Sequence, residues 1–533
     1  SNMISTSSGI LEGLNPNQRE AVQAIDGPVL INAGPGSGKT RVITHRIAYL
    51  ARVCGVNPHR ICAVTFTNKA AREMRERLEL LMGPRGRDIN AGTFHGFCAS
   101  ILRREVEHVG LNRSFVIYDQ EDQIRVIKRA MEMEEIDHQQ FSPTAMLSAI
   151  SSAKSQLIDV ATYSMGQSTP LENVIHRSYR RYQELLIRNN AVDFDDLLFS
   201  TYSLFKENPS VLDRYQSHYV HLLIDEFQDT NVVQYALARQ LAGKYRNICV
   251  VGDPDQSIYS WRNADIRNIL SFQLDYPEAH MVTLEKNYRS TQTILEAAHK
   301  VITSNLRRMD RALHTDNQRG MPVIVSEAYN PEEEAQLVLR EVDRLRRDEG
   351  YNLADCAVMY RVNAQSRAME EGCLRYGIPY KLIGGLRFYQ RKEVKDIIAY
   401  LRVVHNPYDE VSLLRIINVP TRGIGQRTID HLIQIAQSQG ISLYAALQMV
   451  AHDAQDQTHS NSLTPRTTRT VADFLVIINR LREKSNDLPV PEMIDAVLEH
   501  TGYRAHLMEE GHLGRDRLEN VQELRSTSLE FHQ

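Results

Sequence analysis

A short apolar run that breaks into a glycine-rich turn carries the clearest chemistry in this chain. The run is Pro28–Ile31, and the turn contains Asn32, Ala33, Gly34, Pro35, Gly36, Ser37 and Gly38, followed by Lys39 and Thr40. Small residues allow successive backbone N–H groups to converge on phosphate oxygens, and the helix that follows directs its positive end at them. We expect Lys39 to reach the terminal phosphates and the Thr40 hydroxyl to hold Mg²⁺. The pattern predicts a site for a nucleoside triphosphate, although Ala33 stands where the usual G-x-x-x-x-G-K-S/T pattern has its first glycine.

Two carboxylates follow a second apolar run. Val220–Ile224 leads directly into Asp225 and Glu226. This order favours Asp225 as a magnesium ligand, directly or through water, and Glu226 as the group that orients or deprotonates the attacking water. A third apolar run leads into a loop that contains Gln256, whose amide is suited to contact the γ-phosphate or the water. We therefore expect Lys39, Glu226 and Gln256 to take part in hydrolysis.

These polar groups need a scaffold that brings the ends of several strands together. Four apolar runs predict buried parallel strands, at Ile61–Phe66, Val220–Asp225, Ile248–Gly252 and Met281–Leu284. Ligands of such sheets bind at the carboxyl ends of the strands, which is where the polar residues begin here. Between residues 103 and 190 no further strand pattern occurs, and the charged helical stretches there predict a helical insertion in the first α/β domain.

The second half of the chain repeats this alternation. A second α/β rhythm begins with Pro322–Val325 and continues through Cys356–Tyr360, and from about residue 388 the pattern becomes mainly helical. The polar stretch Gln455–Thr470 has little apolar material to bury and predicts a surface loop. The expected fold class is therefore α/β with helical insertions.

Length and composition exclude several classes of protein. A chain of 533 residues is too long for one core and predicts several domains. The formal charge of −4 gives no support for a nucleic-acid ligand, but a groove can be basic on a chain that is neutral overall. Six scattered cysteines without a C-x-x-C pair exclude a disulfide framework or zinc site and favour a cytoplasmic protein. The sequence contains neither 18 consecutive apolar residues nor a signal pattern, so we expect no membrane partner.

Further motifs follow one another in the order of a known family. They are Thr65–Ala71, Gly92–Cys98, Asp225–Asn231, Val251–Trp261 and Leu284–Thr291. Together with the glycine-rich turn they resemble the UvrD/PcrA/Rep family of superfamily-one DNA helicases, over nearly the whole chain. The resemblance implies 3′-to-5′ translocation along single-stranded DNA in repair or replication restart, with ATP and Mg²⁺ as cofactors.

The resemblance also implies a domain plan. Members of the family have the P-loop NTPase fold with two RecA-like domains, 1A and 2A, and an inserted helical domain in each, 1B and 2B. Carried onto this chain, the plan gives 1A at residues 1–108 and 191–284, 1B at 109–190, the first part of 2A at 285–383 and 2B at 384–533.

By the same resemblance, further residues surround the nucleotide. Gln18 would read the adenine edge, with Arg19 beside it, and Arg41 would lie near the nucleotide. Tyr288 would stack on the base, Arg289 would reach across the domain cleft to the γ-phosphate, and Gln256 would sense that phosphate.

Single-stranded DNA requires aromatic platforms beside a cationic track. Phe66, Tyr259 and Trp261 follow strands of the nucleotide site, so each is placed to couple a base contact to the phosphate state. A core anchor remains the alternative role for Trp261. The resemblance adds Thr93 and His95 as strand contacts, and Arg361 and Asn363 as backbone contacts.

A candidate duplex contact lies further along the chain. Gly384–Tyr389 marks the entry to the second insertion, and Val419–Thr428 within it suggests a helix-hairpin-helix phosphate clip. Gly423 and Gly425 permit a tight turn whose N–H groups can face a phosphate, and Arg422 and Arg427 add charge. An ordinary turn between helices is the alternative. We expect single-strand/duplex junctions as partners.

Two family motifs, resembling H-A-A-K-G-L-E-F and R-R-L-x-Y-V-A-x-T-R-A, do not occur before Gln533. We therefore expect a truncated chain that contains only the first part of 2A, binds ATP and DNA, and is impaired in hydrolysis and unwinding. Two other functions remain open. One is the helicase portion of a recombination helicase-nuclease, and the other is a DNA clamp in which ATP controls grip without unwinding.

Overall fold

The computed structural model describes residues 7–166, 169–260, 263–304, 313–361, 365–383, 390–456, 463–510 and 512–530. Trp261, Asn363 and Gly384–Tyr389 lie outside the described residues, so the predictions for them stay predictions. The chain forms two compact units. Unit 1 comprises Ser1–Pro322 with Tyr408–Val411, and unit 2 comprises Val323–Pro407 with Ser412–Gln533.

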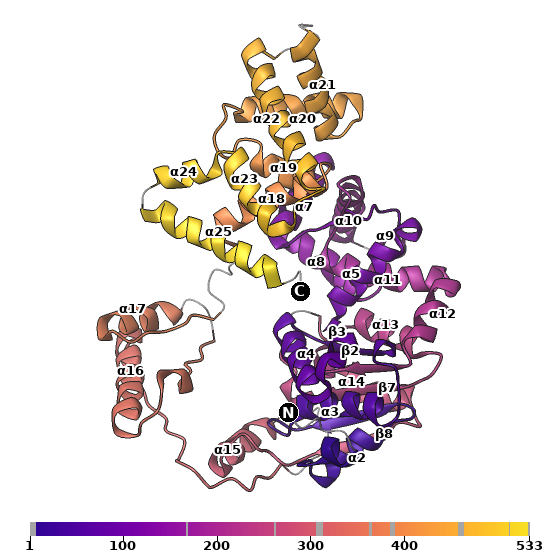
Figure 1. Ribbon diagram of the computed structural model, residues 1–533, viewed down its shortest axis with the longest axis vertical. Helices are drawn as coiled ribbons and strands as arrows, with labels where there is room; N and C mark the ends of the chain where they lie inside the picture. Colours follow the sequence, from indigo (N-terminus) through magenta and orange to yellow (C-terminus); the bar gives the residue numbers. More distant parts are fainter. Residues whose placement is uncertain are drawn as a thin grey trace. The chain divides into compact units, whose positions relative to one another are not determined.

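A parallel sheet forms the centre of unit 1 (Figure 1). Its strand order is β3-β2-β6-β7-β1-β8. The strands are β1 (Val29–Ala33), β2 (Ile61–Thr65), β3 (Asn90–Thr93), β6 (His221–Ile224), β7 (Ile248–Gly252) and β8 (His280–Leu284). The predicted α/β class and the predicted strands of this unit are confirmed. Sequence reasoning missed β3, because its Asn-Ala-Gly-Thr sequence contains no apolar run.

Alternate residues of each strand enter two separate cores, one on each face of the sheet. Leu30 and Val250 lie in the core that also contains Phe97 of α5. Val29 and Val251 lie in the opposite core, with residues of α2, α3 and α4. Because both faces are covered, the strands are continuously apolar and their polar neighbours are confined to the strand ends.

The helices of unit 1 cover these faces and build the first insertion. They are α1 (Ser7–Leu11), α2 (Pro16–Gln23), α3 (Lys39–Arg52), α4 (Asn68–Met82), α5 (Phe94–Arg104), α6 (Val106–Val109), α7 (Gln120–Met133), α8 (Pro143–Ser155), α9 (Val160–Met165), α10 (Pro170–Arg188), α11 (Phe194–Glu207), α12 (Pro209–His218), α13 (Val232–Ala242), α14 (Arg267–Asp275) and α15 (Gln292–Ile302).

The helical stretch expected between residues 103 and 190 is confirmed, with its own core. Residues of α7, α8 and α10 pack together there, joined by Val411 from the segment of later sequence that belongs to unit 1. Two short strands, β4 (Val116–Ile117) and β5 (Ala191–Val192), pair in parallel and bring the two ends of the insertion together. The buried ammonium of Lys154 lies 2.7 Å from Asp193 and 2.8 Å from Asp196, tying α8 to the start of α11.

The regular secondary structure of unit 2 is helical throughout its described residues. Its helices are α16 (Pro331–Asp348), α17 (Ser366–Tyr376), α18 (Lys392–His405), α19 (Glu410–Ile416, whose first two residues belong to unit 1), α20 (Gln426–Gln439), α21 (Leu443–Asp456), α22 (Pro465–Lys484), α23 (Val490–His500), α24 (Tyr503–Glu509) and α25 (His512–Glu530). Residues of α18 and α20–α25 share one apolar core, and the mainly helical pattern expected from about residue 388 is confirmed. No described helix of either unit has the length and apolar character needed to cross a membrane.

Two predicted strands of the second half are wrong. Neither Pro322–Val325 nor Cys356–Tyr360 forms a strand, and Val325 is 92% exposed. A β-strand is stabilised by ladder hydrogen bonds to a neighbour. No strand pairing involves either run within the described residues, so their apolar sequence alone does not produce a sheet. The loop predicted at Gln455–Thr470 is shorter than expected, since α21 continues to Asp456 and α22 begins at Pro465.

Candidate functional site

The glycine-rich turn connects the end of β1 to the start of α3. Gly36 and Gly38 have φ values of +63° and +87°, in the left-handed region that glycine adopts without strain. A Cβ on Gly36 would lie 2.6 Å from Nδ2 of Asn287, so this position also lacks space for a side chain. The N–H groups of Lys39 and Thr40, in the first turn of α3, have no acceptor among the described residues. This arrangement is an anion cradle at a helix N-terminus.

Three of the predicted catalytic side chains meet, because Lys39 contacts both Glu226 and Gln256. Its Nζ lies 3.0 Å from Oε2 of Glu226 and donates to Oε1 of Gln256 at 3.5 Å. The Lys39 side chain is only 11% exposed. The glycine-rich turn, the end of β6 and the loop after β7 therefore meet at one point, as the parallel sheet requires.

Asp225 and Glu226 differ in environment although they are neighbours. Burial, together with the Glu226 carboxylate, raises the pKa of Asp225 to about 6. Glu226 is partly exposed and has a left-handed backbone with φ +49°. A non-glycine residue in that region is strained, and such strain often occurs at functional sites. The buried Asp225 carboxylate and the Thr40 hydroxyl are oxygen donors of the kind that Mg²⁺ prefers, so these residues fit the predicted ion.

Gln18 and Tyr288 lie against the glycine-rich turn. The Gln18 amide donates to the carbonyl of Ser37 at 2.9 Å and accepts from the N–H of Asn15 at 3.1 Å. The Tyr288 N–H donates to the carbonyl of Gly36 at 2.9 Å, and its hydroxyl accepts from Nδ2 of Asn15 at 2.8 Å. Both residues border the predicted nucleotide position, and their roles toward the base stay predictions.

The predicted arginines of this region are exposed. Arg19 lies on α2, Arg41 on α3, and Arg289 in the segment that follows β8. The Cβ of Arg289 is 2.8 Å from the place where a Cβ on Gly36 would lie. The Cβ of Arg289 therefore lies beside the cradle, and Arg289 belongs to the same unit as the glycine-rich turn.

Two predicted DNA-contact residues form an aromatic pair. The rings of Phe66 and Tyr259 have centroids 5.0 Å apart at an interplanar angle of 32°. Phe66 follows β2 and Tyr259 lies in the loop after β7, so the pair lies at the same end of the sheet as the cradle. Both side chains are partly exposed, which leaves area for a base to stack.

His95 and Thr93 have structural contacts of their own. Burial lowers the pKa of His95 to about 4, so the ring is neutral at physiological pH and contributes no charge toward phosphate. Its ring packs edge-on against Phe194 at 5.9 Å. The Thr93 hydroxyl accepts from the N–H of Gly96 and caps α5. No sequence motif drew attention to Phe194, the ring partner of His95. It is a large apolar side chain that is 46% exposed at the first position of α11.

Arg422 makes internal contacts in the predicted phosphate clip, and its role toward a phosphate stays a prediction. Its guanidinium donates to the carbonyls of Ile416 and Val419 and to the Tyr400 hydroxyl, and it lies over the Tyr400 ring. The Arg422 N–H donates to Oδ1 of Asn418, as does the N–H of Ile424. These donors link the turn to α18 and to the end of α19 from inside.

The rest of the predicted phosphate clip remains accessible. Gly423 (φ +83°) and Gly425 are exposed, and a Cβ on either would meet no atom within 4 Å. Arg427 is exposed in the first turn of α20. In the same unit Arg361 is exposed as well, and its N–H donates to Oε1 of Gln365.

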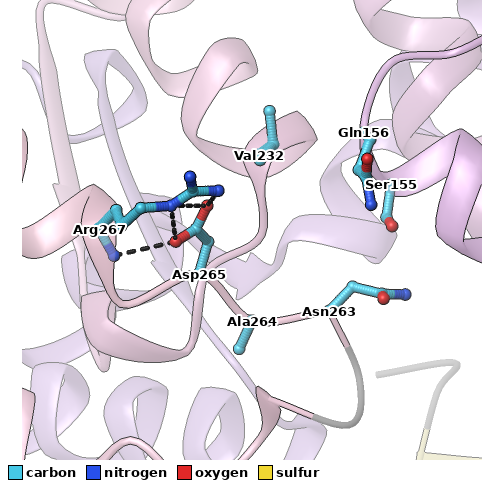
Figure 2. A pocket seen from close by; sticks show the side chains of 7 residues that line it. All are labelled: Ser155, Gln156, Val232, Asn263, Ala264, Asp265 and Arg267. Carbon is cyan, nitrogen blue, oxygen red and sulfur yellow. Dashed lines mark hydrogen bonds and ion pairs between the residues drawn. The ribbon is translucent and has the colours of Figure 1, made fainter.

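A polar cavity of about 490 Å³ lies apart from the cradle, and none of the predicted site residues lines it (Figure 2). Its lining residues are Ser155, Gln156, Val232, Asn263, Ala264, Asp265 and Arg267. Within it, the Asp265 carboxylate accepts hydrogen bonds from the Arg267 guanidinium with both oxygens, so these two charges neutralise each other.

Comparisons with known proteins identify a family for this chain. The model of the UvrD/REP helicase N-terminal domain matches residues 14–277, and that of the UvrD-like helicase C-terminal domain matches residues 282–532. A protein named ATP-dependent DNA helicase PcrA from Bacillus subtilis is 44% identical over 99% of this chain and 70% of its own length. The protein of the same name from Staphylococcus aureus (strain Mu50) is 43% identical over 98% of this chain and 70% of its own length.

These matches do not support the expectations of truncation and impaired hydrolysis, because models of both helicase domains match the chain. They do confirm the family that the motifs resemble, since the matched residues extend across both units. The chain belongs to the UvrD/REP helicase family.

Proposed function

We propose that this protein is an ATP-dependent DNA helicase that translocates 3′-to-5′ along single-stranded DNA in repair or replication restart. The observation that carries the proposal is the meeting of Lys39, Glu226 and Gln256 at the anion cradle, on loops of the sheet that also carry the Phe66–Tyr259 pair. Relatives whose names state ATP-dependent DNA helicase activity support it.

The proposed hydrolysis assigns a distinct task to each group of the cradle. Backbone N–H groups at the start of α3 bind the phosphates, and Lys39 neutralises charge on the γ-phosphate. Glu226 accepts the proton of the attacking water, while Gln256 contacts that water or the γ-phosphate. Asp225 and Thr40 would hold Mg²⁺, which supplies further charge neutralisation on the phosphates. Arg289, beside the cradle, is the candidate for a second cation at the γ-phosphate.

The test is DNA-stimulated ATP hydrolysis together with strand separation. Duplexes with a 3′ tail, a 5′ tail or no tail are incubated with the protein and ATP, and hydrolysis is followed in parallel. We expect single-stranded DNA to stimulate hydrolysis and only the 3′-tailed duplex to unwind. Stimulated hydrolysis without unwinding would instead favour the DNA clamp, and equal unwinding of both tailed duplexes would reject the polarity.

Removing either aromatic ring of the pair should weaken binding to single-stranded DNA. Tyr259→Ala and Phe66→Ala each remove a stacking surface, and base stacking on an aromatic side chain contributes about 1–3 kcal/mol. Anisotropy of a labelled oligonucleotide across a salt series measures the loss. Tyr245→Ala is the matched control, because Tyr245 is exposed just before β7, at the opposite end of the strand. Equal losses for Tyr259→Ala and Tyr245→Ala would contradict the assignment.

Arg427 and Arg422 should respond differently to removal. Arg427→Ala should lower affinity for a single-strand/duplex junction, because an exposed phosphate contact is lost. The slope of log affinity against log salt concentration should become shallower by about one. Arg422→Ala should instead lower the melting temperature, because it removes the hydrogen bonds that Arg422 donates to the carbonyls of Ile416 and Val419 and to the Tyr400 hydroxyl. Unchanged junction binding by Arg427→Ala would favour an ordinary helix turn.

A further inference from the structure

Gln228 connects two loops of the proposed active site. Its side chain is buried, with 1% exposed, two residues after Glu226. Its Nε2 donates to Oε2 of Glu226 at 2.8 Å, and its Oε1 accepts from the N–H of Asp253 at 3.0 Å. One amide thus holds the predicted catalytic carboxylate and the start of the loop after β7 in a fixed relation.

These contacts belong to a closed hydrogen-bonded ring. From Asp253 the ring continues through Oδ2, which accepts from Nε2 of Gln256 at 2.6 Å. Gln256 accepts from Lys39, and Lys39 donates to Glu226, which returns the ring to Gln228. Glutamine is the side chain that suits this place, because it donates with one end and accepts with the other.

The segment around Gln228 also holds the loop that carries Tyr259 at both of its ends. Near the start of the loop, the Ser257 hydroxyl donates to the carbonyl of Gln228 at 3.4 Å. Near its end, the Asp265 N–H donates to the carbonyl of Thr230 at 2.9 Å. These two contacts link the Tyr259 loop to the chain that follows Glu226.

The packing around the Gln228 amide leaves little freedom. A Cβ on Gly252 would lie 2.8 Å from Oε1 of Gln228, so the glycine at the end of β7 is what allows the amide to approach. The left-handed backbone of Glu226 directs its carboxylate back toward the same amide. Gln228 is thus placed to control the orientation of Glu226.

We propose that Gln228 is a positioning residue that orients the Glu226 carboxylate for hydrolysis and couples it to the DNA-contacting loop after β7. This inference rests on the proposed function of the same site. It assigns Gln228 no contact with ATP, because both ends of its amide are engaged by protein groups.

Two variants of Gln228 separate its two hydrogen bonds. Gln228→Met keeps the approximate length but loses both bonds, whereas Gln228→Glu keeps an acceptor for the Asp253 N–H and replaces the donor to Glu226 with a carboxylate that repels it. Both should lower kcat for ATP hydrolysis by about 10-fold to 100-fold, the usual effect of losing an outer-shell hydrogen-bond partner. Affinity for a non-hydrolysable ATP analogue should stay within about threefold, because the cradle and Lys39 are retained.

The stimulation of ATP hydrolysis by DNA distinguishes two roles of Gln228, namely coupling to the Tyr259 loop and orientation of Glu226 alone. In Gln228→Met the ratio of kcat with and without single-stranded DNA should fall toward one, because the link to the loop is lost. In Gln228→Glu the ratio should be largely kept. Gln234→Met is the matched control, since Gln234 is similarly buried but caps α13 outside the ring. It should lower the melting temperature without changing kcat or the ratio.

The outcomes separate this inference from the proposed function. If Glu226→Gln abolishes hydrolysis while Gln228→Met retains the wild-type kcat, the positioning role is overturned and the proposed function remains. If Gln228→Met and Gln234→Met lose kcat and stability alike, Gln228 has only a structural role, which also overturns the inference. If Glu226→Gln itself hydrolyses ATP normally, the proposed catalytic assignment fails first, and the inference falls with it.

Discussion

Replacing Glu226 with glutamine should lower kcat for ATP hydrolysis by about 10²-fold to 10⁴-fold, the range that a general base contributes. The amide keeps the size of the side chain and an oxygen that can accept from Lys39, but it cannot take a proton from water. ATP binding should persist, because removing a negative charge near the γ-phosphate does not remove any phosphate ligand. Single-turnover hydrolysis and analogue titration measure the two effects separately.

Glu278→Gln provides the control for this variant. Glu278 lies just before β8, at the opposite end of the sheet from the cradle, and its ion pair with Arg246 is exposed. Loss of that surface pair should leave hydrolysis unchanged. Wild-type turnover in Glu226→Gln would show that another group activates the water.

Replacing Lys39 with alanine should weaken ATP binding at least about 30-fold. The Lys39 side chain is only 11% exposed and would form a hydrogen-bonded charge pair with the bound phosphates. Losing one partner of such a pair costs about 2–5 kcal/mol, and 1.4 kcal/mol corresponds to a tenfold change in affinity. Lys39 is also the cationic partner of Glu226, at 3.0 Å. Without it, the Glu226 carboxylate would repel the bound phosphates. Calorimetric titration with a non-hydrolysable analogue measures the loss.

Lys244→Ala is the matched control for this second variant. Lys244 is 40% exposed in its side chain and pairs with Asp213 on the surface, away from the glycine-rich turn. Its removal should leave ATP affinity unchanged. Equal affinity in Lys39→Ala and the unaltered protein would contradict the cradle as the triphosphate site.

Parallel geometry explains why much of the site could be predicted. Lys39, Glu226 and Gln256 are more than 200 residues apart at the extremes, yet each follows an apolar strand. Because parallel strands share one carboxyl edge, the order of apolar run and polar residue was enough to bring them together. The resemblance to a family added roles for Gln18 and Tyr288 that no pattern in the chain supplies.

Arg422 and Gln228 show where this reasoning stopped. An arginine beside two glycines indicates a phosphate contact, but only the folded turn reveals that its donors are occupied by carbonyls and by Tyr400. Gln228 looks like an ordinary polar residue after a DE pair, and its importance depends on the approach of Gly252 and Asp253 from another strand. Hydrogen-bond partners distant in sequence leave no periodic signal along the chain.

The sequence by itself determined the anion cradle, the strands of the first sheet and the helical character of both insertions, because these depend on local residue types and on apolar periodicity. The tertiary structure decided whether an apolar run became a strand. Ile248–Gly252 pairs with a strand on each side, whereas Pro322–Val325 pairs with no strand among the described residues. It also decided which polar side chains serve the site and which serve the fold, because a charge or an amide takes its role from the partners that reach it, and those partners come from other strands and loops.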